Sequence, residues 1–75
     1  MKDYGLLLKV TRESRGMTQE QAAEAVGVSV DSWYAYEANK RLPNDETVNR
    51  SCKALEADWL AMYFLEARSH DLAVL

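Results

Sequence analysis

The apolar residues of this chain recur at helical spacing rather than in the alternation expected of a strand. Near the N-terminus, Leu7, Leu8, Thr11 and Arg15 fall near one face, and Gly16 follows as a residue suited to end a helix. No stretch rich in Val, Ile and Thr alternates between turn residues. The pattern predicts an all-α fold with five helices, over about residues 3–15, 18–26, 30–38, 44–55 and from 58 onward.

The second and third helices each begin at a residue that can cap a helix. Thr18 and Gln21 have the spacing of a capping box, in which each side chain bonds the backbone N–H of the other residue. Gly27 suits the left-handed conformation that ends the second helix, and Ser29 caps the third. Two helices joined by so short a turn are typical of a helix-turn-helix.

The last two helices differ in how apolar residues are distributed around them. Asn44 caps the fourth helix, and Val48, Cys52 and Leu55 form its inner stripe at helical spacing. The fifth helix is apolar nearly all round between residues 59 and 65. A helix of this kind has a second apolar face that needs covering.

Composition adds limits to this picture. The chain has 75 residues, enough for a single domain over residues 1–75, with 48% hydrophobic and 28% charged residues and a net charge of -3. The acidic excess lies in residues 56–75, so the remainder is neutral and permits DNA binding without a strong electrostatic attraction. One cysteine and one histidine, Cys52 and His70, cannot form a disulfide within the chain or a zinc cluster. We expect no metal or cofactor.

The chain shows no pattern of a secretory signal or of a membrane span. Its longest apolar run has seven residues, against roughly 20 for a helix that crosses a bilayer. We therefore expect a cytoplasmic protein that does not associate with a membrane. We also expect no enzymatic activity, because no nucleophile with a neighbouring base, no paired carboxylates and no glycine-rich phosphate loop can be identified.

Several sequence segments in order resemble one known family. The chain is similar to the Cro and phage-repressor type of helix-turn-helix domain, often called XRE-like, in residues 18–23 (TQEQAA), 26–29 (VGVS), 36–37 (YE), 40–43 (KRLP) and 46–47 (ET). The resemblance covers roughly residues 6–60 and leaves about 58–75 as a C-terminal helical extension. It implies a compact five-helix, lambda-repressor-like domain. In that family such a domain is usually a transcriptional repressor that acts as a homodimer on double-stranded DNA.

The resemblance also implies a DNA-binding surface, with the third helix, about residues 29–38, in the major groove. The positions that it assigns to this surface are Gln19, Ser29, Val30, Asp31, Ser32, Tyr34, Ala35, Lys40 and Arg41. Gln19 would contact a phosphate and brace the third helix, and Ser29 would lie near the DNA backbone. Lys40 and Arg41 would contact phosphates from the loop after that helix. As two adjacent cations beside the third helix, they also suit this role on their own.

The base-facing positions carry an unusual set of side chains. The resemblance places Val30, Asp31 and Ala35 against base edges, with Ser32 and Tyr34 at the margin. Val30 and Ala35 can touch a thymine methyl group but lack the bidentate pairing that gives about 1 to 3 kcal/mol of discrimination per base. Asp31 can accept a hydrogen bond from cytosine N4, or it can serve as an anion in the first turn of the helix.

Two further groups of residues complete the prediction. The resemblance implies a structural ion pair between Arg12 and Glu37, which would join the first helix to the end of the third. The apolar fifth helix predicts a dimer or partner surface formed by Trp59, Leu60, Tyr63 and Phe64. In the alternative arrangement the domain buries Trp59, Met62 and Tyr63 and leaves Leu60 and Phe64 at its surface.

Two functions fit these features. The first is a sequence-specific DNA-binding regulator that works as a homodimeric repressor. The second is a protein-interaction module of the same fold, which acts through the apolar fifth helix and whose DNA binding is weak or lost. The two differ in whether the chain binds DNA in a salt-dependent way.

Overall fold

The computed structural model describes the backbone of residues 3–74 and the side chains of residues 3–67. All regular structure in these residues is helical, as α1 (Tyr4–Ser14), α2 (Gln19–Val26), α3 (Val30–Glu37), α4 (Asp45–Leu55) and α5 (Trp59–Val74). The predicted all-α fold with five helices is confirmed. The predicted helix ends agree with the observed ones to within one or two residues. The side chain of His70 lies outside the described residues.

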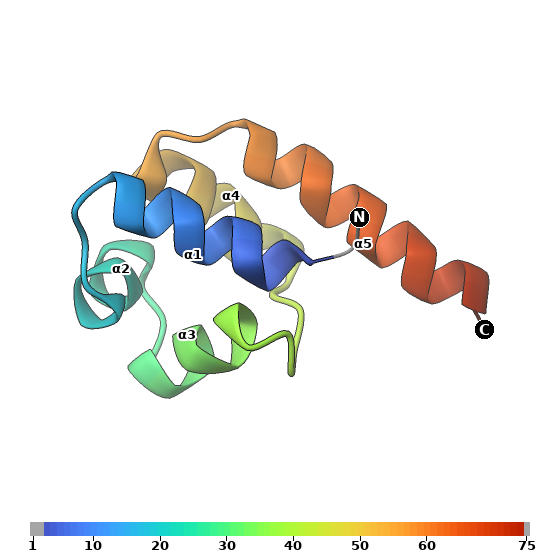
Figure 1. Cartoon of the computed structure of the whole chain (residues 1–75), viewed down its shortest axis with the longest axis horizontal. Helices are drawn as coiled ribbons and strands as arrows, with labels where there is room; N and C mark the ends of the chain where they lie inside the picture. The colour runs from blue at the N-terminus through green and yellow to red at the C-terminus, as the bar shows by residue number, and fades with distance from the viewer. Residues whose placement is uncertain (1–2, 75) are drawn as a thin grey trace.

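Helix α1 occupies the middle of the molecule. It packs against α3 on one side and α5 on the other, and α4 contacts both α2 and α5 (Figure 1). Helices α2 and α3 lie together at one end of the molecule, while the C-terminal turns of α5 extend past the other helices. The arrangement leaves the outer sides of α3 and α5 on different parts of the surface.

The predicted helix caps are present. Thr18 and Gln21 form the capping box, with the Gln21 N–H donating to the Thr18 hydroxyl at 3.0 Å and the Thr18 N–H donating to Gln21 Oε1 at 2.9 Å. The Ser29 and Asn44 side chains accept from the third residue of α3 and α4, at 3.1 Å and 2.9 Å. These side chains satisfy backbone donors that have no partner inside the helix.

One continuous core joins the five helices. Its buried apolar members are Tyr4, Leu8, Ala22, Ala23, Val26, Trp33, Tyr36, Val48, Cys52, Leu55, Ala57, Leu60, Phe64 and Ala67. Helix α1 turns a slightly different face inward than its apolar spacing suggests. Arg15 is exposed, and its guanidinium donates to the carbonyls of Leu55 and Glu56 at 2.7 and 3.0 Å, so it holds the end of α4 from outside.

A close approach between the N-terminus of α1 and the end of α3 depends on Gly5. A Cβ atom at Gly5 would lie 2.5 Å from the carbonyl oxygen of Glu37 and 2.6 Å from that of Tyr36. Asn39, at φ 60°, accepts from the Gly5 N–H at 2.9 Å and donates to the Asp3 carboxylate. Absence of a side chain at Gly5 therefore lets the two helices meet.

Helix α5 buries two of the four residues predicted for its partner surface and leaves the other two exposed. Leu60 and Phe64 are buried, at 0% and 5% exposure, because α5 lays them against α1 and α4. Trp59, Met62 and Tyr63 are exposed instead, at 46%, 72% and 37%. Leu60 and Phe64 thus belong to the core and not to a partner surface, and the alternative arrangement is also wrong.

Candidate nucleic-acid interface

The turn between α2 and α3 sets the angle at which these helices meet. Gly27 has φ 86°, and the N–H groups of Gly27 and Val28 both donate to the Ala23 carbonyl, at 2.9 and 3.0 Å. Val28 is half-buried against the core, which fixes the turn from inside. A glycine in the left-handed conformation and an apolar residue packed against the core therefore set the turn of a helix-turn-helix.

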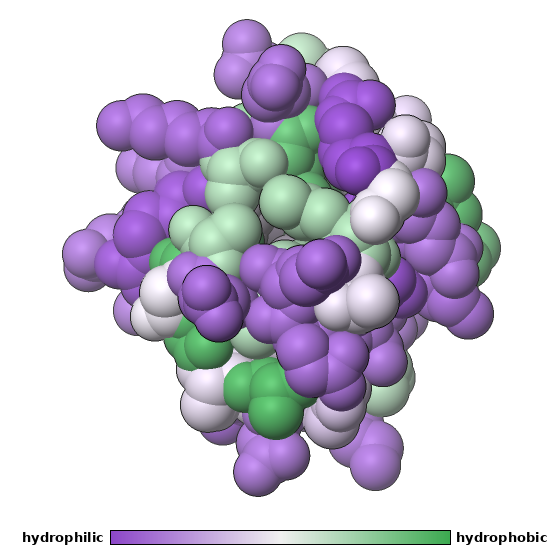
Figure 2. All heavy atoms as spheres, turned by 90° about the vertical axis from the view of Figure 1, so that its left-hand side faces the viewer, coloured by the Kyte–Doolittle hydropathy of each residue, from purple (hydrophilic) through white to green (hydrophobic). Residues whose placement is uncertain are grey.

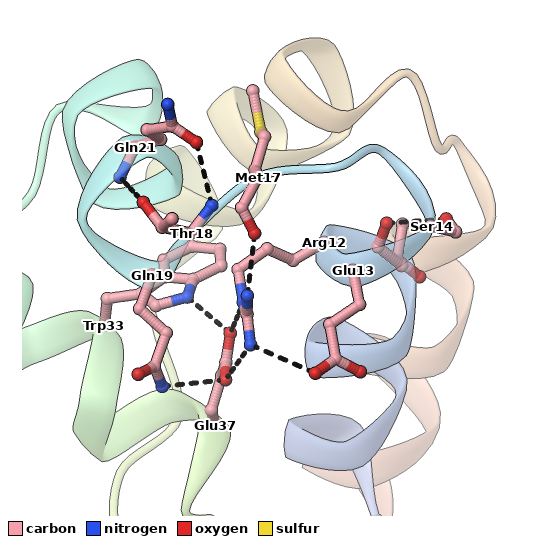
Figure 3. A network of polar contacts seen from close by, with 10 residues as sticks. Arg12, Glu13, Ser14, Met17, Thr18, Gln19, Gln21, Trp33 and Glu37 are labelled. Atoms are coloured by element: carbon pink, nitrogen blue, oxygen red, sulfur yellow. Dashed lines mark hydrogen bonds and ion pairs between the residues drawn. The ribbon is translucent and has the colours of Figure 1, made fainter.

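The carboxylate of Glu37 joins three helices through hydrogen bonds (Figure 3). Arg12 of α1 donates to both of its oxygens, from Nε at 2.6 Å and from Nη2 at 3.2 Å. Gln19 Nε2 of α2 donates at 3.0 Å and Trp33 Nε1 of α3 at 2.5 Å. Arg12 also donates from Nη1 to the Met17 carbonyl at 2.8 Å, so its guanidinium bonds the α1–α2 loop as well.

The ion pair between Arg12 and Glu37 is shielded from solvent. The side chains are 9% and 5% exposed, and the hydrogen bonds to Glu37 raise the pKa of the Arg12 guanidinium. The structure thus brings together the two residues that the resemblance pairs. A buried pair with its hydrogen bonds satisfied fixes the geometry of the elements that it joins. Here it fixes the orientation of α3.

The expected base-facing residues lie on the outer side of α3, with one partial exception. Asp31 and Tyr34 are exposed, and Ser32 and Ala35 are half-buried. Val30 is half-buried as well, but it packs against the core, so only part of its side chain is available outside. The outer side therefore offers one carboxylate, two hydroxyls and a methyl group.

The expected phosphate-contacting residues flank this helix. Lys40 and Arg41 are exposed in the loop after α3, and the Arg41 guanidinium lies over the Tyr36 ring, 5.4 Å from its centroid. That contact holds the cation beside α3. Gln19, at the start of α2, donates its side-chain amide to Glu37 at the end of α3.

A family comparison agrees with this geometry. The family model of the helix-turn-helix domain matches residues 3–60. The chain belongs to the helix-turn-helix domain family. The comparisons with curated proteins and with solved structures found no significant match.

The end of this helix-turn-helix domain that carries α2 and the turn into α3 is largely hydrophilic. Figure 2 shows small apolar areas there, separated by polar side chains. Such a surface has no large apolar area that a partner would need to cover.

Sequence reasoning missed one contact between the two helices of the motif. The Tyr34 hydroxyl donates to Glu20 Oε2 at 2.9 Å, across the outer side of α2 and α3. The pKa of the Glu20 carboxyl is lowered, first by its own backbone N–H and then by Tyr34, and the same hydrogen bond raises the pKa of Tyr34. The two residues are 14 positions apart, and no local pattern indicates their contact.

The surface of α5 forms a second candidate site. Trp59, Met62 and Tyr63 are exposed there, together with Leu65 at 57%. Arg15 lies over the Trp59 ring at 5.7 Å, which places this ring near the end of α1. We call Trp59, Met62 and Tyr63 the α5 surface.

The structure offers no site for a metal among its described residues. Within them, no group of three or more His, Cys, Asp or Glu side chains is placed to hold an ion. No helix within residues 3–74 combines the length and the apolarity needed to cross a membrane.

Proposed function

We propose that this helix-turn-helix domain is a sequence-specific DNA-binding regulator of the Cro and phage-repressor, XRE-like type. Helix α3 would lie in the major groove, with Asp31 and Ala35 toward base edges and Lys40 and Arg41 on phosphates. The Glu37 network carries this proposal, because it holds α3 with its outer side free while bonding α1 and α2. Fixed geometry of this kind is what a reading helix requires.

Salt-dependent binding to duplex DNA tests this role. Fluorescence anisotropy would measure affinity for the DNA that flanks the gene and for random duplexes, between about 50 and 200 mM salt. The double substitution Lys40→Ala and Arg41→Ala should weaken binding to every sequence. It should also reduce the slope of log K against log salt by about 1.8, or 0.9 per lost phosphate contact.

The matched control for this experiment is Lys53→Ala. Lys53 is exposed in the last turn of α4, so the substitution removes a cation outside the proposed interface. Its affinity and salt slope should stay close to those of the unmodified domain. A domain that binds none of these duplexes even at low salt would disprove the DNA-binding role.

We further propose that the domain acts as a homodimeric repressor in the cytoplasm and that the α5 surface forms the contact between two copies. Large apolar side chains exposed on one helix support this, since surfaces of this kind are commonly covered by a partner. Met62→Glu should shift sedimentation from dimer to monomer at micromolar concentration. Ala25→Glu, which adds the same charge on exposed α2, should leave the dimer intact. A monomer before substitution would contradict this arrangement.

The second candidate function is a protein-interaction module that uses the same α5 surface. This function is favoured by Val30 and Ala35, whose side chains cannot form hydrogen bonds, because discrimination between bases depends on such bonds. The DNA titration separates the two functions. A module of this kind would sediment as an assembly through the α5 surface and show no salt-dependent DNA binding.

A further inference from the structure

Glu20 places a negative charge beside the helix proposed to enter DNA. It lies in the first turn of α2, next to Gln19, and is exposed. The Tyr34 hydroxyl holds its carboxylate at 2.9 Å, and Tyr34 itself is exposed on the outer side of α3. The hydrogen bond therefore keeps the carboxylate close to the proposed DNA surface.

The charge balance of this surface makes one carboxylate important. Lys40 and Arg41 contribute two positive charges, and Glu20 and Asp31 contribute two negative charges, so two minus two gives zero. Affinity for DNA depends strongly on neutralising phosphates, and carboxylates near phosphates oppose it. Removing one carboxylate would give this surface a net charge of +1.

Asp31 and Glu20 differ in what they can do on DNA. Asp31 lies in the first turn of α3, at a position from which a carboxylate can accept from cytosine N4. Glu20 lies on α2, which in this motif crosses the DNA backbone rather than entering the groove. Its charge therefore faces phosphates and has no base amino group to accept from.

We infer that Glu20, held beside α3 by the Tyr34 hydroxyl, lowers the affinity of the domain for DNA of every sequence, and that Tyr34 is its positioning residue. This inference rests on the proposed DNA-binding function. The backbone N–H of Glu20 and, after it, the hydrogen bond from Tyr34 also lower the pKa of the Glu20 carboxyl, so it stays ionised at neutral pH. The effect is thus present under the conditions in which the domain would bind DNA.

Charge removal at Glu20 tests the inference. Glu20→Gln keeps the size of the side chain and should raise the affinity for duplex DNA by about three- to tenfold near 0.1 M salt. It should also steepen the salt slope by up to about 0.9. Glu24→Gln is the matched control, since Glu24 is exposed one turn, or roughly 6 Å, farther along α2. It should change affinity by less than about twofold.

A second variant tests the positioning role of Tyr34. Tyr34→Phe keeps the ring but removes the hydroxyl, so the Glu20 carboxylate remains and is no longer held at α3. Affinity should rise less than with Glu20→Gln, and adding Tyr34→Phe to Glu20→Gln should give no further rise, because no carboxylate is left to release. A rise in affinity on Tyr34→Phe that persists in the Glu20→Gln background would overturn the positioning role.

The possible results separate this inference from the function on which it rests. Binding by the unmodified domain with equal affinities for Glu20→Gln and Glu24→Gln would overturn the inference alone. Absence of DNA binding by all of these variants would overturn the proposed function and the inference with it. Thermal unfolding of each variant checks that the compared domains are folded.

Discussion

Helices α3 and α5 pack on opposite sides of α1, and they are held there by different chemistry. At α3, the carboxylate of Glu37 accepts hydrogen bonds from Arg12, Gln19 and Trp33. At α5, the contact is apolar, and the Phe64 ring meets the Tyr4 ring edge to face at 5.9 Å. Close packing thus holds α5 against α1, whereas at α3 directed polar bonds add to the packing of Trp33 and Tyr36 in the core.

This difference matters for what each helix can present outside. Directed hydrogen bonds have narrow geometry, so the Glu37 network fixes both the position and the rotation of α3. Apolar packing carries no such direction, and α5 has apolar residues on both its inner and its outer side. Helix α3 therefore suits contacts that require a fixed orientation. Helix α5 suits an apolar contact whose strength depends on the area that it buries.

The largest loss of stability is expected from a substitution in α5, which apolar packing holds against α1. Phe64→Ala should lower the free energy of unfolding by about 4 kcal/mol, because it removes a buried ring and leaves a cavity. Met62→Ala, two residues away on the exposed side, should change it by less than about 0.5 kcal/mol in the monomer. Urea unfolding at low protein concentration measures both. Equal effects would contradict the orientation of α5.

Removing the ion pair between α1 and α3 should cost somewhat less stability. Arg12→Met keeps the length of the side chain but leaves the Glu37 charge buried without its cation, which should lower the free energy of unfolding by about 3 kcal/mol. Glu13→Gln is the control, because Glu13 lies 3.8 Å from Arg12 and its side chain is 55% exposed. Its effect should stay below about 0.5 kcal/mol.

A smaller loss is expected where α1 and α3 come closest. Gly5→Ala adds a methyl group against two carbonyl oxygens of α3, and backbone cannot move aside as a flexible side chain can. We expect a loss of about 2 kcal/mol in the free energy of unfolding, as for other overpacked sites. Gly16→Ala strains a positive φ instead and meets no atom within 4 Å, so comparing the two by thermal unfolding separates clash from conformational strain.

Local patterns in the sequence account for much of the fold. The caps at Thr18, Ser29 and Asn44 depend on residues three positions away, so the sequence alone predicts them. The helices of the motif follow from these caps and from the glycine at position 27. The residues expected to face bases lie on the outer side of α3 for the same reason, and their contact with DNA stays a prediction.

Contacts between distant segments could not be predicted in this way. The run from residue 59 to 65 is apolar at every position, so helical spacing does not select the inner face of α5. For that reason the sequence predicts a surface position for Leu60 and Phe64, which lie in the core. The contact of Gly5 with Asn39 spans 34 positions and depends on the crossing of α1 and α3. Helix crossing is a property of the packed molecule.

The smallest effect concerns a polar atom on the apolar side of α1. Among the described residues, the Tyr4 hydroxyl is the buried side-chain polar atom without a hydrogen-bond partner, whereas the Glu37 carboxylate on the opposite side has four donated bonds. A buried hydroxyl without a partner is destabilising. Tyr4→Phe should therefore raise the free energy of unfolding by about 1 kcal/mol.

The pH dependence of the free energy of unfolding tests whether burial of the Tyr4 hydroxyl causes the gain in Tyr4→Phe. Burial raises the pKa of Tyr4 well above its ordinary value of about 10, and Cys52 adds to the shift. Above about pH 10 the unfolded chain releases this proton while the folded one keeps it, so the stability of the unmodified domain falls as pH rises. Tyr4→Phe should lose less stability between about pH 9 and 11 in urea unfolding, and its advantage should grow with pH. A constant difference between the two proteins over that range would show that the Tyr4 hydroxyl reaches water.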